Sequence, residues 1–173
     1  NIDTTCTHCP AGWYQNKVGK QYCVSCPIGR YGSEKRTCED CPAGMYTKRK
    51  AQIDCLNCDQ GFYSSETAQS NCKKCPPQSN TEKDGSISDS ACVCNKDYYA
   101  ERDDSGNSIC SSCPPNSGTN QFIGATNRSF CRCQNGYWKP PDGKECLICP
   151  KHATCLNGKL PLTNQGYWKA PWK

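Results

Sequence analysis

Cysteine pairs dominate this sequence, and two neighbouring thiols can bind a metal, exchange electrons or form covalent cross-links. Nineteen of the 173 residues are Cys, and seven pairs have the spacing Cys-x-x-Cys, beginning at Cys6, Cys23, Cys38, Cys55, Cys72, Cys110 and Cys146. Pairs of this kind occur in zinc sites, in thiol–disulfide oxidoreductases and in structural disulfide frameworks. Each chemistry implies a different function, so we separate the three first.

Zinc binding is disfavoured by the residues around the pairs. Proline has no N–H to donate to a metal-bound thiolate, yet it directly follows six of the seven pairs, as Pro10, Pro27, Pro42, Pro76, Pro114 and Pro150. Two further pairs, at Cys92 and Cys131, have the spacing Cys-x-Cys, which suits a four-sulfur site poorly. The two histidines, His8 and His152, each lie between cysteines and are more simply read as surface side chains. We expect no metal and no cofactor, with an intracellular zinc protein as the minor alternative.

Redox catalysis is disfavoured by the number of Cys-x-x-Cys pairs. A reactive Cys-x-x-Cys normally occurs once, at a helix start that lowers the pKa of one thiol, whereas here seven copies lie in a chain without helical periodicity. No Ser, His and carboxylate set is singled out by spacing, and two histidines leave little for general base chemistry. We therefore expect no catalytic residues and no enzyme activity.

Composition favours structural disulfides. Val, Ile, Leu and Phe together number only 18, whereas Cys exceeds the roughly 8–10% typical of a disulfide scaffold. Disulfides persist in oxidising compartments, so we expect an extracellular or cell-surface location reached through the secretory pathway. No apolar run approaches the roughly 18 residues of a membrane span and no signal peptide is present, so we expect a mature segment of a longer protein.

Charge gives little indication of the partner. The net charge is +5, with 11 basic and 10 acidic residues in 1–90 and 10 and 6 in 91–173. The longest basic run, Lys48-Arg49-Lys50, is read as a solvated loop tip, with a contact to an acidic polysaccharide or a phosphate as the alternative. A nucleic-acid signature is absent, so we expect protein partners.

An internal repeat organises the first part of the chain. Successive pairs from Cys6 to Cys72 begin 17, 15, 17 and 17 residues apart. An aromatic residue follows a glycine by two positions in most units, as in Gly12/Tyr14, Gly29/Tyr31, Gly44/Tyr46, Gly61/Tyr63, Gly136/Trp138 and Gly166/Trp168. This pattern predicts short two-stranded loops closed by disulfides, each aromatic packing on its neighbour. The predicted fold class is small disulfide-rich: an elongated linear array of short β-loop modules with little or no helix and a minimal hydrophobic core.

The repeat also restricts disulfide pairing. In what we call the ladder, the second cysteine of each pair bonds to the first cysteine of the next pair. It gives Cys9–Cys23, Cys26–Cys38, Cys41–Cys55, Cys58–Cys72, Cys75–Cys92, Cys94–Cys110, Cys113–Cys131, Cys133–Cys146 and Cys149–Cys155, and leaves Cys6 unpaired within the chain. We expect Cys6 to pair with a preceding unit. The rival is a crossed scheme, first to third and second to fourth, which leaves Cys146 unpaired.

Two longer stretches carry a family resemblance. CKKCPPQSNTEKDGSISDSACVCNKDYY (72–99) and CSSCPPNSGTNQFIGATNRSFCRCQNGYW (110–138) resemble the cysteine-rich, EGF-like segment of ephrin receptors. The earlier Cys-Pro-x-Gly-x-Tyr loops resemble its companion repeats and the first loop of tumour-necrosis-factor-receptor modules. The resemblance implies extended extracellular modules without catalytic residues. Two departures are Asp59 in place of proline and Asp97 in place of glycine, which put the turn before Tyr98-Tyr99 in question.

The expected organisation and function follow from the repeat and the resemblance together. We expect short loop repeats at 1–71, ephrin-receptor-like modules at 72–109 and 110–145, and a partial module at 146–173. The predicted function is a non-catalytic rod-like spacer and protein-interaction surface of a large surface or secreted protein. The alternative is a structural subunit of an extracellular filament or matrix, binding copies of itself or other subunits.

Several single residues complete the predictions. The only permitted Asn-x-Ser/Thr sequon, Asn127-Arg128-Ser129, predicts an N-glycan on Asn127. Asp103, Asp104 and Asn107 lack the spacing of a calcium loop and are read as a solvated turn. Three tryptophans are expected to be exposed, where they either bind a partner or cover the next unit, the second being preferred; they are Trp138, Trp168 and Trp172.

Overall fold

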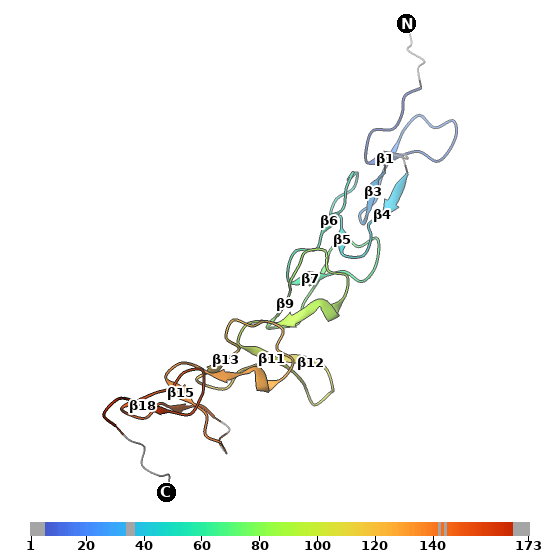
Figure 1. Ribbon diagram of the computed structural model, residues 1–173. Helices are drawn as coiled ribbons and strands as arrows, with labels where there is room; N and C mark the ends of the chain where they lie inside the picture. The colour runs from blue at the N-terminus through green and yellow to red at the C-terminus, as the bar shows by residue number, and fades with distance from the viewer. Residues whose placement is uncertain (1–5, 34–36, 142, 144, 168–173) are drawn as a thin grey trace. The chain divides into compact units, whose positions relative to one another are not determined.

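Short antiparallel strand pairs are the repeated element of this protein (Figure 1). The computed structural model describes residues 6–33, 37–141, 143 and 145–167. This part of the chain contains 18 strands, two single-turn 3-10 helices and no α-helix. It thus belongs to the predicted class, a small disulfide-rich array of β-loop modules. None of the described segments forms a helix long and apolar enough to cross a bilayer.

The strands are two to five residues long. They are β1 (Trp13–Tyr14), β2 (Val24–Ser25), β3 (Arg30–Gly32), β4 (Cys38–Asp40), β5 (Met45–Tyr46), β6 (Leu56–Asn57), β7 (Phe62–Tyr63), β8 (Lys73–Lys74), β9 (Ser79–Thr81), β10 (Cys92–Cys94), β11 (Tyr98–Arg102), β12 (Ser108–Ser112), β13 (Ser117–Gly118), β14 (Arg132–Cys133), β15 (Tyr137–Trp138), β16 (Leu147–Ile148), β17 (Ala153–Thr154) and β18 (Leu162–Thr163). The 3-10 helices are η1 (Asp89–Ala91) and η2 (Arg128–Phe130).

Each strand pairs with the next one along the chain, which gives nine two-stranded sheets. In the first sheet Trp13 lies opposite Ser25 and Tyr14 opposite Val24. In the first eight sheets the second strand includes the residues between the two cysteines of a pair, whereas β18 lies after Cys155. The expected two-stranded loops are therefore present, and in the first eight of them the second strand coincides with a Cys-x-x-Cys or Cys-x-Cys segment.

A residue with positive φ precedes the first strand of each pair. At Gly12 φ is 81°, and the N–H of Trp13 donates to the carbonyl of Pro10 at 3.0 Å. This geometry resembles a type II turn, whose third position favours glycine. Asp97 takes the same conformation with φ of 65°, and the N–H of Tyr98 donates to the carbonyl of Asn95. The turn that the sequence put in question is thus formed.

Nine disulfides close the loops of the described chain, each with a Cα–Cα separation between 5.5 and 5.8 Å. They join Cys9 to Cys23, Cys26 to Cys38, Cys41 to Cys55, Cys58 to Cys72, Cys75 to Cys92, Cys94 to Cys110, Cys113 to Cys131, Cys133 to Cys146 and Cys149 to Cys155. These pairs are those of the ladder. Cys6 is exposed and has a free thiol.

The interior consists mainly of sulfur and hydroxyl groups. Seven half-cystines are buried, namely Cys26, Cys41, Cys58, Cys75, Cys94, Cys133 and Cys155, together with Tyr46, Ala125 and Trp138. Five hydroxyl side chains are also buried, namely Thr47, Ser64, Thr81, Ser117 and Thr119. A core with so few aliphatic groups depends on cross-links and hydrogen bonds for its stability.

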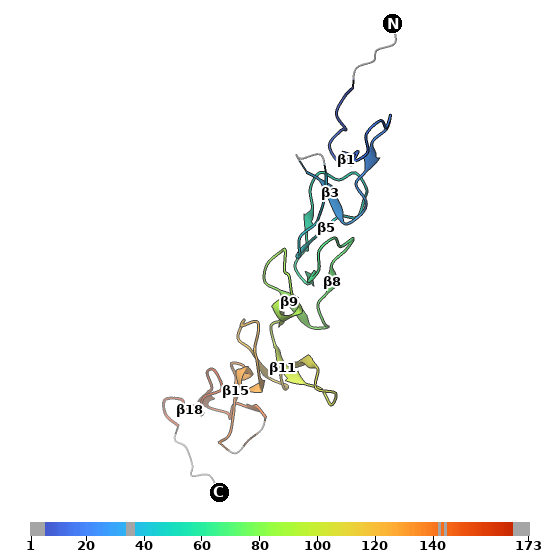
Figure 2. The same ribbon diagram turned by 90° about the vertical axis from the view of Figure 1, so that its right-hand side faces the viewer.

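The chain divides into two compact units. The first comprises 1–75 and 80–92, and the second 76–79 and 93–173. Within the first unit, β1, β3 and β5 follow one another in chain order in both views (Figures 1 and 2). The finer division at residues 72, 110 and 146 stays a prediction.

Candidate functional site

The Cys-x-x-Cys segments are extended, which determines what their sulfurs can do. Val24 and Ser25 form β2 between Cys23 and Cys26. Side chains three positions apart on a strand point to opposite faces, so the two sulfurs of a pair diverge. A zinc site needs converging thiolates, whereas here each sulfur is bonded into a different loop. Within the described residues, no group of three His, Cys, Asp or Glu side chains is placed to hold a metal.

The second cysteine of a pair also uses its backbone to connect loops. The N–H of Cys26 donates to the carbonyl of Gly12 at 2.8 Å, which closes the first hairpin. Its carbonyl accepts from the N–H of Ala51 at 2.9 Å, from a later loop. The same bond to a later loop recurs for Ala68 to Cys41, Gly85 to Cys58 and Gly124 to Cys94, at 2.7 to 2.8 Å. These half-cystines therefore join neighbouring loops as well as closing their own.

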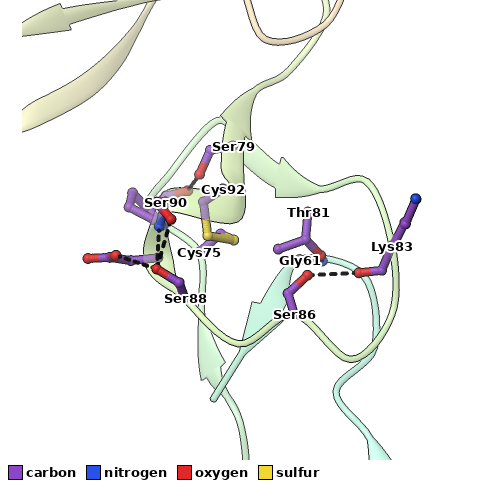
Figure 3. The surroundings of a disulfide bond; sticks show 11 residues. Gly61, Cys75, Ser79, Thr81, Lys83, Ser86, Ser88, Ser90 and Cys92 are labelled. Carbon is purple, nitrogen blue, oxygen red and sulfur yellow. Dashed lines mark hydrogen bonds between the residues drawn. A yellow bond between two sulfur atoms is a disulfide. The ribbon is translucent and has the colours of Figure 1, made fainter. Parts of the chain in front are cut away.

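A buried hydroxyl from one loop satisfies the turn of the loop before it. Each accepting threonine lies three positions after the positive-φ residue of its own turn. The Gly29 N–H donates to Thr47 Oγ1 at 2.8 Å, the Gly61 N–H to Thr81 Oγ1 at 2.9 Å and the Asp97 N–H to Thr119 Oγ1 at 3.0 Å. Figure 3 shows Thr81 beside Gly61, near the disulfide of Cys75 and Cys92. Sequence analysis missed these hydroxyls, although Thr47 and Thr81 occupy equivalent repeat positions.

Three turn glycines are tightly packed against later backbone. A Cβ added to each would lie 2.1 to 2.3 Å from a carbonyl oxygen, in the pairs Gly12 and Ala51, Gly29 and Ala68, and Gly44 and Gly85. Each of these oxygens belongs to the second disulfide loop further along the chain. Glycine is therefore required here for close approach as well as for positive φ.

One of the three tryptophans expected at the surface, Trp138, is buried. Trp138 is only 6% exposed, and its backbone forms a parallel bridge with Gly158, so the expectation of exposure was wrong for this residue. Equivalent bridges join Tyr31 to Gln52 and Tyr46 to Gln69. The aromatic position thus lies where a later loop covers it. Trp168 and Trp172 lie outside the described residues.

Asn127 is exposed and initiates η2. Its side-chain oxygen accepts from the N–H of Ser129 at 2.9 Å and from the Ser129 hydroxyl. The sequon residues are therefore in mutual contact at the surface. The N-glycan on Asn127 stays a prediction.

Asp103 forms a self-contained turn between β11 and β12. Its carboxylate accepts from the backbone N–H of Asn107 at 2.8 Å, from the Asn107 side chain at 3.2 Å and from the N–H of Ser105 at 3.0 Å. These hydrogen bonds, the backbone bond from Asn107 above all, lower the pKa of Asp103 below its ordinary value.

The basic run has a partner within its own loop. Lys48 Nζ lies 5.2 Å from the ring centre of Tyr46, a cation–π distance. All three basic residues of the run are exposed, including Lys48. The run is consistent with a loop tip.

Tandem β loops, each closed by a disulfide and joined to later loops through backbone and hydroxyl groups, define a disulfide-rich repeat protein. Residues 1–35 and 48–92 match the family model described as tyrosine-protein kinase ephrin type A/B receptor-like. This part of the chain consists of ephrin-receptor-like cysteine-rich repeats. The match includes the short loops and the start of the stretch 72–99. A comparison with curated proteins finds no match.

Proposed function

We propose that this chain is a non-catalytic extracellular segment that acts as a rod-like spacer and protein-interaction surface of a large surface or secreted protein. The main support is the interlocking of the loops. Three turn glycines of the first unit, Gly12, Gly29 and Gly44, lie close to backbone from a later loop, as Gly29 does to Ala68. Contacts that repeat at a nearly regular spacing make a stack whose units hold one another in place. The proposed location rests on nine disulfides and on the ephrin-receptor-like match.

Solution scattering tests the spacer role. A spacer requires a monodisperse monomer whose maximum dimension is several times its cross-section. Reduction of the disulfides should convert the scattering to that of a flexible coil. A compact, near-spherical particle in the oxidised protein would contradict the proposal.

A filament or matrix subunit is the second candidate, and exposed apolar side chains of the second unit favour it. Leu147 and Ile148 on β16 are 49% and 74% exposed, and Leu162 on β18 is 68% exposed. Exposed aliphatic groups that gather into a patch are typical of surfaces that associate. Concentration-dependent sedimentation that is abolished by Ile148→Lys and retained with Ile53→Lys, a change at an exposed isoleucine of the first unit, would support this role.

A glycan on Asn127 is part of the proposal. The secreted protein should lose mass on enzymatic deglycosylation, and Asn127→Gln should abolish that shift. An unglycosylated wild-type protein from a eukaryotic secretory host would remove the glycan from the proposal.

A further inference from the structure

The net positive charge is concentrated at the C-terminal end of the sequence. Residues 110–173 contain eight Lys and Arg and two acidic residues, whereas 1–109 contain 13 and 14. When the chain is divided at residue 90 the excess of positive charge is less visible, because four acidic residues, Asp97, Glu101, Asp103 and Asp104, then count with the C-terminal part. The whole net charge of +5 therefore comes from the last 64 residues. Such asymmetry attracts anionic partners to one end of a molecule.

Two of these cations line a pocket of the second unit. The pocket has a volume of about 440 Å³, and its lining includes Arg128, Lys139, Ser117 and Ser129. This volume is within the roughly 300–1,000 Å³ of small-ligand sites. Two disulfides, through Cys131 and Cys146, fix its walls. Covalent cross-links thus hold part of the pocket wall in place.

Neither cation of the pocket is neutralised within the described residues. The ion pair found there joins Arg30 and Asp40, in the first unit. The acidic residues of 110–173 are Asp142, outside the described residues, and Glu145, which does not line the pocket. Arg128 and Lys139 are both exposed, so their N–H groups are available to an anion.

The serine hydroxyls of the pocket require a hydrogen-bond donor on the ligand, whereas the two cations require a negative charge. The Ser117 hydroxyl donates to the carbonyl of Pro114 at 2.7 Å, and the Ser129 hydroxyl donates to the side-chain oxygen of Asn127. Each hydroxyl already donates its proton within the protein, so it can only accept a hydrogen bond from a ligand. A bare anion or an acidic side chain has no O–H to offer them. A sugar that carries a carboxylate or sulfate offers donors to the serines and negative charge to the cations.

We propose that the pocket lined by Arg128, Lys139, Ser117 and Ser129 binds an acidic sugar unit of an extracellular glycan. Arg128 and Lys139 donate charge-assisted hydrogen bonds to the carboxylate or sulfate. The serine oxygens accept from sugar hydroxyls. The inference rests on the proposed function only for the extracellular location.

Calorimetric titration with a size-defined, sulfated uronic-acid oligosaccharide tests the site at about 150 mM salt, where charges beyond about 8 Å are largely screened. All proteins are produced in a host that attaches no N-glycans, so that a glycan on the chain itself cannot fill the pocket and the contact between Asn127 and Ser129 is retained. The double variant Arg128→Gln/Lys139→Gln should lower the affinity by about tenfold or more, the factor expected for a lost hydrogen bond to a charged group. The matched control Lys151→Gln/Lys159→Gln removes the same charge from residues that do not line the pocket, and it should retain the affinity.

Each other outcome overturns the proposal. Equal losses in the two double variants would indicate diffuse attraction to the basic segment. Binding of a polyglutamate peptide with equal affinity and the same variant dependence would assign the site to acidic protein. Absence of binding by the parent protein would remove the site altogether. A thiol count and amide exchange pattern unchanged from the parent would show that each variant is folded, and scattering of the same samples tests the spacer role separately.

Discussion

The hydroxyl oxygen of Thr81 lies 2.9 Å from the backbone nitrogen of Gly61, which precedes it by 20 positions (Figure 3). Thr81 is only 1% exposed. The bond joins two successive loops across a disulfide that belongs to only one of them. It shows that a chain poor in aliphatic side chains stabilises its turns with hydroxyl groups from the following loop.

Thr81→Val should therefore weaken the turn at Gly61. Valine keeps the shape and removes the acceptor, so a partly buried N–H loses its partner at a cost of about 1–3 kcal/mol. Amide exchange of Gly61 should accelerate by about tenfold or more. Thr67→Val, at an exposed threonine, is the matched control and should leave that rate unchanged. Equal rates in the two variants would show that the hydroxyl is not needed.

Gly29→Ala should disrupt folding far more than Gly19→Ala. Both glycines have positive φ, 83° and 75°, so each alanine costs about 1 kcal/mol in backbone conformation. At Gly29 the new Cβ would also lie 2.1 Å from the Ala68 carbonyl oxygen, whereas at Gly19 nothing lies within 4 Å. We expect a loss of several kcal/mol for Gly29→Ala. Urea unfolding with the disulfides intact measures both changes, and similar midpoints would show that the close approach is not maintained.

Asp97→Ala should destabilise the second unit, whereas Asp97→Asn should be tolerated. Asp97 accepts from the N–H of Thr119 and donates its own N–H to the Thr119 hydroxyl, both at 3.0 Å. Asparagine retains an acceptor and tolerates positive φ, but alanine does neither. The expected difference is about 1–3 kcal/mol in the free energy of unfolding. Thermal unfolding of both variants in parallel checks the order, and a more stable alanine variant would contradict it.

The β11–β12 turn should weaken in acid. Because the folded-state pKa of Asp103 is lowered by the Asn107 hydrogen bonds, its contribution to stability is present above the unfolded-state pKa and is lost as pH falls through the folded-state value. A carboxyl-carbon NMR titration should place the midpoint below the ordinary aspartate value. Asn107→Ala removes the side-chain bond and should raise the pKa. An unchanged midpoint would mean that the bond does not form in solution.

A disulfide map should recover the ladder. Mass spectrometry of peptides cleaved without reduction should find Cys9 linked to Cys23 and Cys26 linked to Cys38. A thiol count in denaturant should be near zero or one for the secreted protein. Recovery of a Cys6–Cys23 peptide would refute the pairing, and a count near 19 would restore the zinc alternative.

Spacing in the sequence predicts closure within a loop but not contact between loops. The turn at Gly12 and the strand Val24–Ser25 follow from local chemistry, since glycine permits positive φ and the short loop brings the cysteines together. The contact between Gly12 and Ala51 is made by backbone atoms, which have no residue-type signature. Positive φ at Gln78, Asn116 and His152 could not be predicted either, because the repeat imposes this conformation on residues whose type does not indicate it.

The aromatic position shows both the success and the limit of pattern analysis. Tyr46 and Trp138 are buried as a packing role requires, but Tyr31 and Tyr63 are only half-buried. The repeat indicated an aromatic ring in most units without showing how much a later loop covers it. The same limit explains the error at Trp138, because the covering bridge comes from Gly158, 20 residues further along.

The divergent sulfurs of the extended Cys-x-x-Cys strands have a mechanical consequence. A pulling force applied at Cys9 and Cys155 would run along an unbroken covalent path, crossing each loop through its disulfide and each strand through two or three peptide steps. The loops lie off this path and carry no tension. At about 3.5 Å per residue, even a fully unravelled but oxidised chain could reach only about a quarter of the length available to the reduced polypeptide. Between Cys9 and Cys155 the disulfides therefore set the maximum extension of the chain, whether or not its loops are folded.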